Sequence, residues 1–375
     1  MLRRQRELDS TLELDRADPR LHDVLRLGAY QLRWLTRVPS HAAVSTSVEL
    51  ARETVGEGST GYVNHSLRRL TGAGFRVSAA GSSHPDWLVQ RWKNQFGPAE
   101  TERLIAWNDA KPELTLQPAR WDRETLASRL RDAGLDVTAA PFGAGLRIGL
   151  TPGTRHPATR DLPGYSEGGW IVQDPAHSLV ARFAAIPSGE QVYDACAAPG
   201  GKAVALEAAG ARVLAGDARH ERIGRLADTT RRAGVAIRSV AANLEAAPLR
   251  PASVAAVLVD APCTATGTIR RHPDARWRLS SNVFARMAER QQRLLAAAAA
   301  LVRPGGLLIY ATCSLEPEEN EQVVEHFLKR NREFTRALPH APVPAELVTA
   351  AGDFQSLPHR HGIDGAYAAR LARAR

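Results

Sequence analysis

The sequence is poor in lysine and cysteine and has no long apolar run. Of its 49 basic residues only four are lysines, and three cysteines, an odd number, argue against a framework of disulfides. The longest apolar run, residues 294–302, is too short to cross a bilayer, and the first residues lack the apolar stretch of a signal peptide. We therefore expect a soluble, cytoplasmic protein with no membrane association.

Acidic residues are also in deficit, because 40 Asp and Glu face 49 Lys and Arg and leave a formal net charge of +9. This balance favours a polyanionic partner, nucleic acid before any other. An excess of arginine over lysine fits a GC-rich coding sequence equally well, so the charge alone does not identify the partner. The 375 residues, 44% of them hydrophobic, suffice for two or three domains with cores of their own.

Three stretches of the chain differ in their apolar pattern. Residues 1–76 have helical spacing, and residues 83–165 mix short strands with helices. From 166 to 375, strands and helices alternate, which predicts a doubly wound, mostly parallel α/β sheet. The strands expected there are 192–195, 212–215, 235–241, 254–259 and 307–311, and the helices are 219–232, 283–302 and 317–331.

A loop of small residues follows the first strand of this sheet, where residues 194–202 read DACAAPGGK. Small residues let the backbone approach a ligand, and the next helix presents its N-terminal amides there. Asp217 follows the second strand and is placed to bind the ribose of a nucleotide-like cofactor. The loop alone leaves NAD possible, although the absence of G-x-G-x-x-G disfavours a nicotinamide enzyme.

Two cysteines follow two further strands, Cys263 within Asp-Ala-Pro-Cys and Cys313 within Thr-Cys-Ser. The carboxyl ends of parallel strands share one edge, so we expect both thiols over the cofactor. Methylation of cytosine at carbon 5 needs such a group, because a thiolate adding to C6 makes C5 nucleophilic. The thiol must leave again, so a base or second group near C5 is useful. Buried cysteines are usually inert, and these residues alone do not rank the two.

Charged residues surround both cysteines. A helix beginning near Pro317 favours a thiolate at Cys313, whereas the repulsion of nearby glutamates opposes it. These glutamates are Glu316, Glu318 and Glu319. The loop after Cys263 carries Arg270, Arg271 and His272, with Trp277 nearby, as a loop that grips phosphates and stacks on bases would require. The alternative is a solvated basic turn.

Together these motifs resemble the RsmB/Sun-type family of bacterial RNA (cytosine-5) methyltransferases. The most specific segments are DACAAPGGK at 194–202, DAPCTATGTIRRHPDARW at 260–277 and YATCSLEPEENE at 310–321. Residues 23–32 and 38–51 resemble a NusB-like RNA-binding domain. The resemblance implies a Rossmann-like class I S-adenosylmethionine-dependent methyltransferase domain, preceded by an all-α NusB-like domain and a small α+β linker domain.

The resemblance also implies roles for single residues. Cys313 matches the family's nucleophile, Cys263 the cysteine that assists release of the methylated RNA, and Asp260 a residue at the pocket for cofactor and target base. The S-adenosylmethionine loop corresponds to Cys196, Ala197, Ala198, Pro199, Gly200, Gly201 and Lys202, and the ribose-binding acid to Asp217. Asn243 stands where the family usually has an acid near the adenine, so we expect weaker cofactor binding. Other departures are Pro175, His177 and Ala366.

The implied function is methylation of a cytosine in ribosomal RNA, with small-subunit RNA favoured by the NusB-like start. A transfer RNA substrate, or a catalytically silent RNA-binding or assembly factor of the same fold, remain alternatives. We expect a monomer without a metal ion. We also expect the helical domain to start upstream of Met1 and to expose an apolar face. The residues expected on that face are Leu21, Val24, Leu25, Leu27, Tyr30, Leu32 and Leu35.

Overall fold

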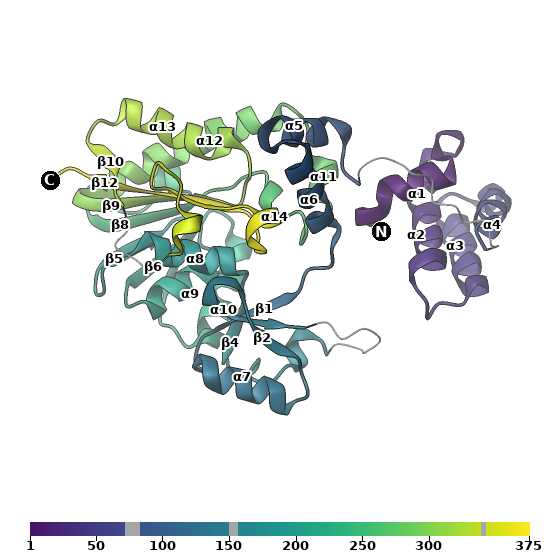
Figure 1. Cartoon of the computed structure of the whole chain (residues 1–375), viewed down its shortest axis with the longest axis horizontal. Coiled ribbons are helices and arrows are strands. Elements are labelled where there is room, and N and C mark those ends of the chain that lie inside the picture. Colours follow the sequence, from purple (N-terminus) through teal and green to yellow (C-terminus); the bar gives the residue numbers. More distant parts are fainter. Residues whose placement is uncertain (72–82, 150–156, 339–342) are drawn as a thin grey trace. The chain divides into compact units, whose positions relative to one another are not determined.

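The chain forms two compact units (Figure 1). The computed structural model describes residues 1–71, 83–149, 157–338 and 343–375. The N-terminal unit comprises Met1–Asp109 with Arg276–Arg278, and the C-terminal unit comprises Ala110–Ala275 with Leu279–Arg375. None of the helices in these described ranges is long and apolar enough to cross a membrane.

The N-terminal unit is helical, as its spacing predicts. Its helices are α1 (Gln5–Leu12), α2 (His22–Trp34), α3 (Ser40–Thr54), α4 (Thr60–Arg68), α5 (Asp86–Phe96), α6 (Pro98–Asp109) and the short α11 (Ala275–Arg278). Leu8 of α1, Leu25 of α2 and Leu67 of α4 are fully buried in one apolar cluster. Burial of one apolar stripe from each helix holds the helices α1, α2, α3 and α4 together, and α5 packs against α6.

The expected exposed apolar face is largely wrong. Leu21, Val24 and Leu25 are buried, because they pack in the same cluster as the apolar side chains of α1. Only Leu27 and Leu35 of the expected set are large exposed hydrophobics, with 37% and 41% of their surface accessible. Scattered side chains of this kind are normal on a protein surface.

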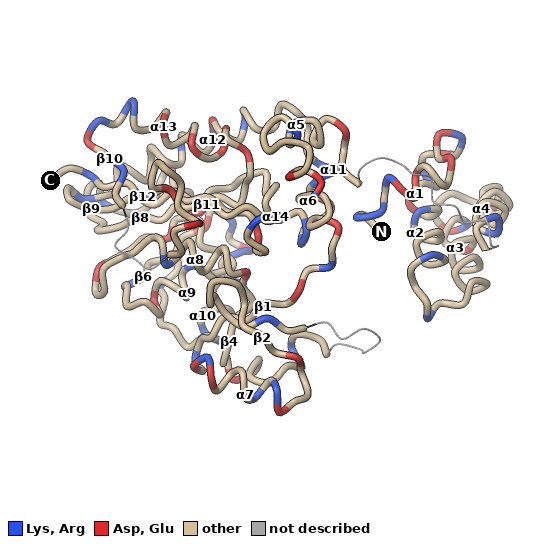
Figure 2. Tube along the Cα trace, viewed as in Figure 1, with Lys and Arg blue, Asp and Glu red and all other residues tan. Residues whose placement is uncertain are grey.

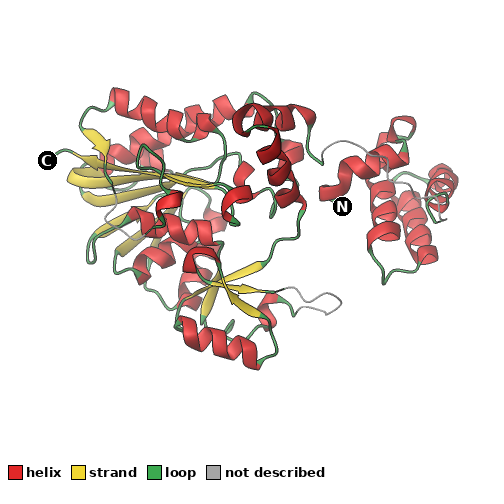
Figure 3. Cartoon of the chain, viewed as in Figure 1, coloured by secondary structure: helices red, strands yellow, loops and turns green. Residues whose placement is uncertain are grey.

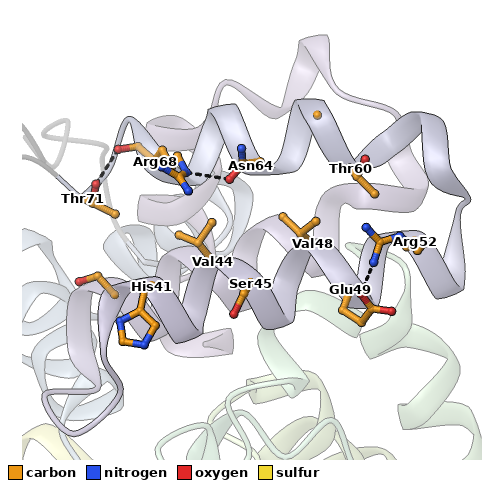
Figure 4. A pocket seen from close by; sticks show the side chains of 12 residues that line it. His41, Val44, Ser45, Val48, Glu49, Arg52, Thr60, Asn64, Arg68 and Thr71 are labelled. Carbon is orange, nitrogen blue, oxygen red and sulfur yellow. Dashed lines mark hydrogen bonds and ion pairs between the residues drawn. The ribbon is translucent and has the colours of Figure 1, made fainter.

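A groove of about 630 Å³ lies between α3 and α4 (Figure 4). Val44 and Val48 lie along it, and Arg52 and Arg68 are at its sides. Arg52 is paired with Glu49 and with a second glutamate in the turn before α4, whereas Arg68 donates to the neutral side chain of Asn64. Within the described residues, carboxylates therefore neutralise Arg52 but not Arg68.

The short helix α11 belongs to the N-terminal unit although its neighbours in sequence do not. Arg276 is fully buried, and its guanidinium lies 2.9 Å from the carboxylate of Asp109. Trp277 donates its indole N–H to the carbonyl of Leu2 at 3.0 Å. The ring of Trp277, which was expected to stack on a base, is thus hydrogen-bonded within the helical unit.

The C-terminal unit contains a small antiparallel sheet and a large mixed sheet (Figure 3). The small sheet has the order β2-β3-β1-β4 and is covered by α7 (Arg123–Asp132). Its strands are β1 (Leu114–Pro118), β2 (Val137–Ala139), β3 (Leu146–Ile148) and β4 (Trp170–Val172). Trp170 packs against Leu126 and Leu130 of α7, so β4 lies beyond the limit of 165 expected for the linker domain.

The large sheet has the order β10-β12-β9-β8-β5-β6-β7, with β11 paired to β12. Its strands are β5 (Gln191–Asp194), β6 (Arg212–Asp217), β7 (Arg238–Ala241), β8 (Val254–Asp260), β9 (Val302–Thr312), β10 (Phe334–Arg336), β11 (Phe354–Ser356) and β12 (Ala366–Arg373). The five from β5 to β9 are parallel, and β12 pairs antiparallel with β9. The expected parallel α/β sheet is therefore confirmed.

Helices cover both faces of the large sheet (Figure 1). One layer contains α8 (Pro175–Ala184), α9 (Gly201–Ala208) and α10 (His220–Ala233), and the other contains α12 (Val283–Leu301) and α13 (Glu321–Arg330). A last short helix, α14 (Pro358–His361), precedes β12. Because both faces are covered, the apolar run of β8 is buried almost throughout. The carboxyl ends of β5, β6, β8 and β9 then meet at one edge.

Candidate active site at the carboxyl edge of the large sheet

The loop between β5 and α9 passes closely under the edge of the sheet. Gly200 caps α9 with a φ of 109°, a conformation that favours glycine. A side chain at Gly201 would begin 2.7 Å from Nε2 of Gln173. Arg222 of α10 donates to the carbonyl of Ala198 at 2.6 Å and so fixes the loop. Gly200 is thus favoured by its backbone conformation, and a side chain at Gly201 would require Gln173 to move.

Asp194 is the last residue of β5 and the first residue of the DACAAPGGK motif. It was not among the residues predicted to form the site. It is fully buried, and within the described residues neither of its oxygens accepts a hydrogen bond of normal geometry. Burial and, to a smaller extent, repulsion from Asp260 raise the pKa of Asp194 to about 7. An unpartnered buried carboxylate of this kind is suited to a cationic ligand.

Asp217 ends the neighbouring strand β6 and is also buried. It accepts a hydrogen bond from the backbone N–H of Arg219 at 3.0 Å and lies 3.3 Å from the guanidinium of Arg222. Asn243 follows β7, is exposed, and accepts a hydrogen bond from the N–H of Glu245 at 3.2 Å. The structure therefore places the expected ribose and adenine residues after successive strands.

Lys202 and Asp260 form an ion pair, with Nζ 2.6 Å from Oδ2. Burial alone would lower the pKa of Lys202, but the carboxylate of Asp260 raises it above its ordinary value. His177 of α8 lies 3.2 Å away through Nδ1. Burial and the charge of Lys202 lower the pKa of His177 to about 3, so this ring is neutral and accepts a hydrogen bond from Lys202.

The two thiols meet as the strand order predicts. Sγ of Cys263, after β8, lies 3.3 Å from Sγ of Cys313, after β9. Contact with Cys313, followed by burial, raises the pKa of Cys263 well above its ordinary value. Cys263 therefore keeps its proton at neutral pH. The third cysteine, Cys196, lies in the loop of residues 194–202 that the sequence predicts to bind the cofactor (the cofactor loop), where burial raises its pKa to about 12.

A pocket of about 480 Å³ opens beside the pair formed by Lys202 and Asp260. Its lining includes Gln173 and His177, together with Ala197, Ala198 and Pro199 of the cofactor loop. Arg271 and His272, from the loop after Cys263, also line it. The pocket therefore joins the cofactor loop to the segment that carries Cys263.

The arginines expected to bind RNA have partners within the protein. Arg271 lies between Asp174 and Asp364, at 2.6 Å from each carboxylate. Arg270 is buried and donates to the carbonyl of Lys111 at 2.6 Å. Their role in RNA binding stays a prediction. The geometry favours a structural role for Arg271, because a phosphate contact there would leave two buried carboxylates without their cation.

His272, the third residue of this expected set, is exposed at the pocket. Lys and Arg are spread over the chain and mixed with Asp and Glu (Figure 2). Within the described ranges, no group of three or more His, Cys, Asp or Glu side chains is arranged to hold a metal ion.

Models of known protein families match three parts of the chain. The family model of 16S rRNA methyltransferase RsmB/F matches residues 183–372, the NusB family matches 1–71, and the ferredoxin-like domain of RsmF/B-like methyltransferases matches 84–149. A probable ribosomal RNA small subunit methyltransferase B of Synechocystis sp. is 36% identical, and the alignment covers 100% of this chain and 89% of that relative.

The chain belongs to the RsmB/F methyltransferase family. The ribosomal RNA small subunit methyltransferase B of Citrobacter koseri is 34% identical over 94% of this chain and 82% of its own length. The crystal structure of PH0851 has a TM-score of 0.83 and 25% identity, and covers 99% of this chain and 88% of that chain. NSun6 from Pyrococcus horikoshii, solved with SFG, shares the fold with a TM-score of 0.67 at 18% identity, over 78% of this chain and 98% of its own.

These findings confirm the expected family and fold class, a Rossmann-like methyltransferase domain behind a NusB-like helical domain. The domain limits expected at residues 76 and 165 stay predictions. The contacts within the structure instead divide the chain after Asp109 and assign residues 276–278 to the helical unit.

Proposed function

We propose that this RsmB/F-family methyltransferase transfers a methyl group from S-adenosylmethionine to carbon 5 of a cytosine in small-subunit ribosomal RNA. The observation that carries the proposal is the pair of thiols 3.3 Å apart at the ends of β8 and β9. The RNA class comes from the relatives, which are named ribosomal RNA small subunit methyltransferases.

The residues at the ends of β5, β6 and β7 fit this cofactor. The unpartnered carboxylate of Asp194 is suited to its cationic amino group, and Asp217 to its ribose hydroxyls. Asn243 offers an amide to the adenine, and the amides at the start of α9 suit a carboxylate. When bound, the cofactor supplies an electrophilic methyl group.

The two thiols divide the remaining work. The Cys313 thiolate forms a bond to C6 of the base, and the displaced electron pair makes C5 nucleophilic. After C5 has gained the methyl group, it must lose its proton, and the sulfur–C6 bond then breaks to restore the ring. Cys263 lies 3.3 Å from Cys313, and once the sulfur of Cys313 is bonded to C6, the contact that raised the pKa of Cys263 is lost, so Cys263 can be deprotonated and accept the C5 proton. Asp260, oriented by Lys202, offers an oxygen to the amino group of the base.

Methyl transfer from labelled S-adenosylmethionine to unmodified RNA tests the proposal. Label should enter small-subunit ribosomal RNA, and digestion of the product should yield 5-methylcytidine. Incorporation into transfer RNA alone would reassign the substrate, and a different methylated nucleoside would refute the cytosine chemistry. A protein that binds RNA but transfers no label to either RNA would be a silent assembly factor.

A further inference from the structure

The carboxylate of Glu319, in the turn Pro317–Glu319, lies between the segments that carry the two thiols. The side chain is fully buried and reaches across from the segment after Cys313 to the one after Cys263. We infer that Glu319 is a positioning residue, which holds the two cysteines at the separation that their shared reaction requires. This inference rests on the cysteine chemistry proposed above.

The contacts of Glu319 are divided between the two segments. Its Oε1 accepts hydrogen bonds from the backbone N–H of Thr264 at 2.9 Å and from Nε2 of Gln291 at 3.0 Å. Its Oε2 accepts from Oγ of Ser314 at 2.5 Å and from Oγ1 of Thr264. Thr264 directly follows Cys263, and Ser314 directly follows Cys313. The residue that follows each cysteine therefore donates a hydrogen bond to the same carboxylate.

The carboxylate is itself held in place by rigid elements. Tyr310 of β9 donates its hydroxyl to the backbone carbonyl of Glu319 at 2.6 Å. Gln291 of α12 donates to Glu319 and also to the carbonyl of Pro262, at 2.9 Å. The link between the two thiol segments is thus anchored in a strand on one side and a long helix on the other.

Stability alone is a poor reason to bury this charge. In the part of the chain that the structure describes, no Lys, Arg or His pairs with Glu319. Burial raises the pKa of Glu319, whereas the hydrogen bonds from Ser314, Thr264 and Gln291 lower it. A buried ion without a cation is costly unless its lone pairs are filled, and an apolar residue would avoid that cost. Its four donors instead define one arrangement of the two segments.

The shared reaction explains why the relative position of the two thiols has to be closely defined. One thiol must reach C6 of the base, while the other assists at the neighbouring atom C5. Misplacement of a reacting group by about 1 Å can cost on the order of 100-fold in rate. A carboxylate joined to both segments restricts their relative movement more strongly than separate contacts for each would.

The test compares Glu319→Ala and Glu319→Gln with two controls. Glu325→Gln removes an exposed carboxylate from α13, and Val323→Ala removes buried apolar volume from the same helix. Val323→Ala serves as the control for a general loss of stability, and melting temperatures are measured for all four variants. Glutamine keeps one oxygen as the acceptor for the N–H of Thr264 and for Gln291, but its NH2 group replaces the second oxygen, so the hydroxyls of Ser314 and Thr264 would have to accept rather than donate. Glu319→Gln should therefore retain more function than Glu319→Ala.

The first measurement requires neither RNA nor cofactor. A bifunctional bimane reagent that fluoresces on bridging two thiols is reacted to completion, and the bridged peptides are identified by mass spectrometry. Wild type and both controls should bridge Cys263 to Cys313 in high yield, Glu319→Gln in intermediate yield and Glu319→Ala in low yield. Unchanged bridging in Glu319→Ala would overturn the inference, whether or not the protein methylates RNA.

The second measurement separates kcat from KM. Glu319→Ala should lower kcat by on the order of 100-fold and leave the KM values for cofactor and RNA nearly unchanged. An equal loss of kcat in Val323→Ala would show that the effect is general destabilisation, and would overturn the positioning role. If Cys313→Ala stays active, the proposed function fails instead, and the bridging measurement still decides whether Glu319 sets the distance between the thiols.

Discussion

Two buried carboxylates lie at the carboxyl edge of the large sheet and differ in their hydrogen bonds. Asp194 has no hydrogen-bond partner of normal geometry among the described residues, whereas Glu319 accepts from four donors. Both are fully buried, so exposure does not distinguish them. A buried polar group without a partner indicates a place for a ligand, and one whose lone pairs are filled belongs to the scaffold. In the proposed function, the bound cofactor would therefore complete the region around Asp194, whereas contacts within the protein already organise the cysteine region.

A third arrangement, in which an arginine neutralises buried carboxylates, gives the largest expected effect. Arg271→Ala would leave Asp174 and Asp364 without their cation, and loss of such a partner costs about 3–5 kcal/mol. Urea unfolding should show this loss of stability, while Arg225→Ala, on the exposed side of α10, should change little. If Arg271→Ala is as stable as Arg225→Ala but weakens RNA binding in a salt-dependent way, Arg271 contacts phosphate after all.

The unpartnered Asp194 should make cofactor binding depend on pH. With its pKa near 7, its carboxyl is neutral below that pH and charged above it. A cationic ligand favours the charged form, so the affinity for S-adenosylmethionine should rise by up to about tenfold per pH unit below 7 and level off above it. Calorimetry between pH 5.5 and 8 measures this trend.

Asp194→Asn is the matched control for this titration, because any slope that it retains belongs to the cofactor's own amino group. The variant should also bind more weakly at pH 8, by about 1.5–3 kcal/mol for a lost hydrogen bond to a charged group. Equal affinity and an equal slope in both proteins would remove Asp194 from the cofactor site.

Asn243 gives the smallest expected effect, since its side chain is exposed. Replacing it with an acid restores a charged acceptor for the adenine, and charge-assisted hydrogen bonds are stronger than neutral ones. Asn243→Asp should therefore tighten S-adenosylmethionine binding by about 1 kcal/mol. Unchanged or weaker binding in calorimetry would show that Asn243 only caps its own turn.

The sequence predicted those parts of the site that follow from strand order. Cys263 and Cys313 could be placed at one edge because their apolar strands are visible as local patterns. Arg271 could not be interpreted in this way, because its partners Asp174 and Asp364 are 97 and 93 residues away and no local pattern connects them.

Glu319 was visible in the sequence only as one of several glutamates expected to oppose a thiolate. Its contacts with Thr264 and Gln291 depend on the packing of α12 against the strand ends. The antiparallel strands β10, β11 and β12 were likewise not predicted. The first two have only three residues each, and β12 is rich in alanine, so none of them has a clear strand pattern. Partners fixed by tertiary packing were thus the features that the sequence did not reveal.

The central claim, a covalent bond between Cys313 and the target base, is tested most directly by trapping the protein on its RNA. Cys263→Ala, incubated with S-adenosylmethionine and unmodified small-subunit RNA, should accumulate a protein–RNA adduct that survives a denaturing gel. Cys313→Ala and the double variant should form no adduct and transfer no methyl group. An adduct that persists in Cys313→Ala and is absent from Cys263→Ala would reverse the roles of the cysteines and contradict this account.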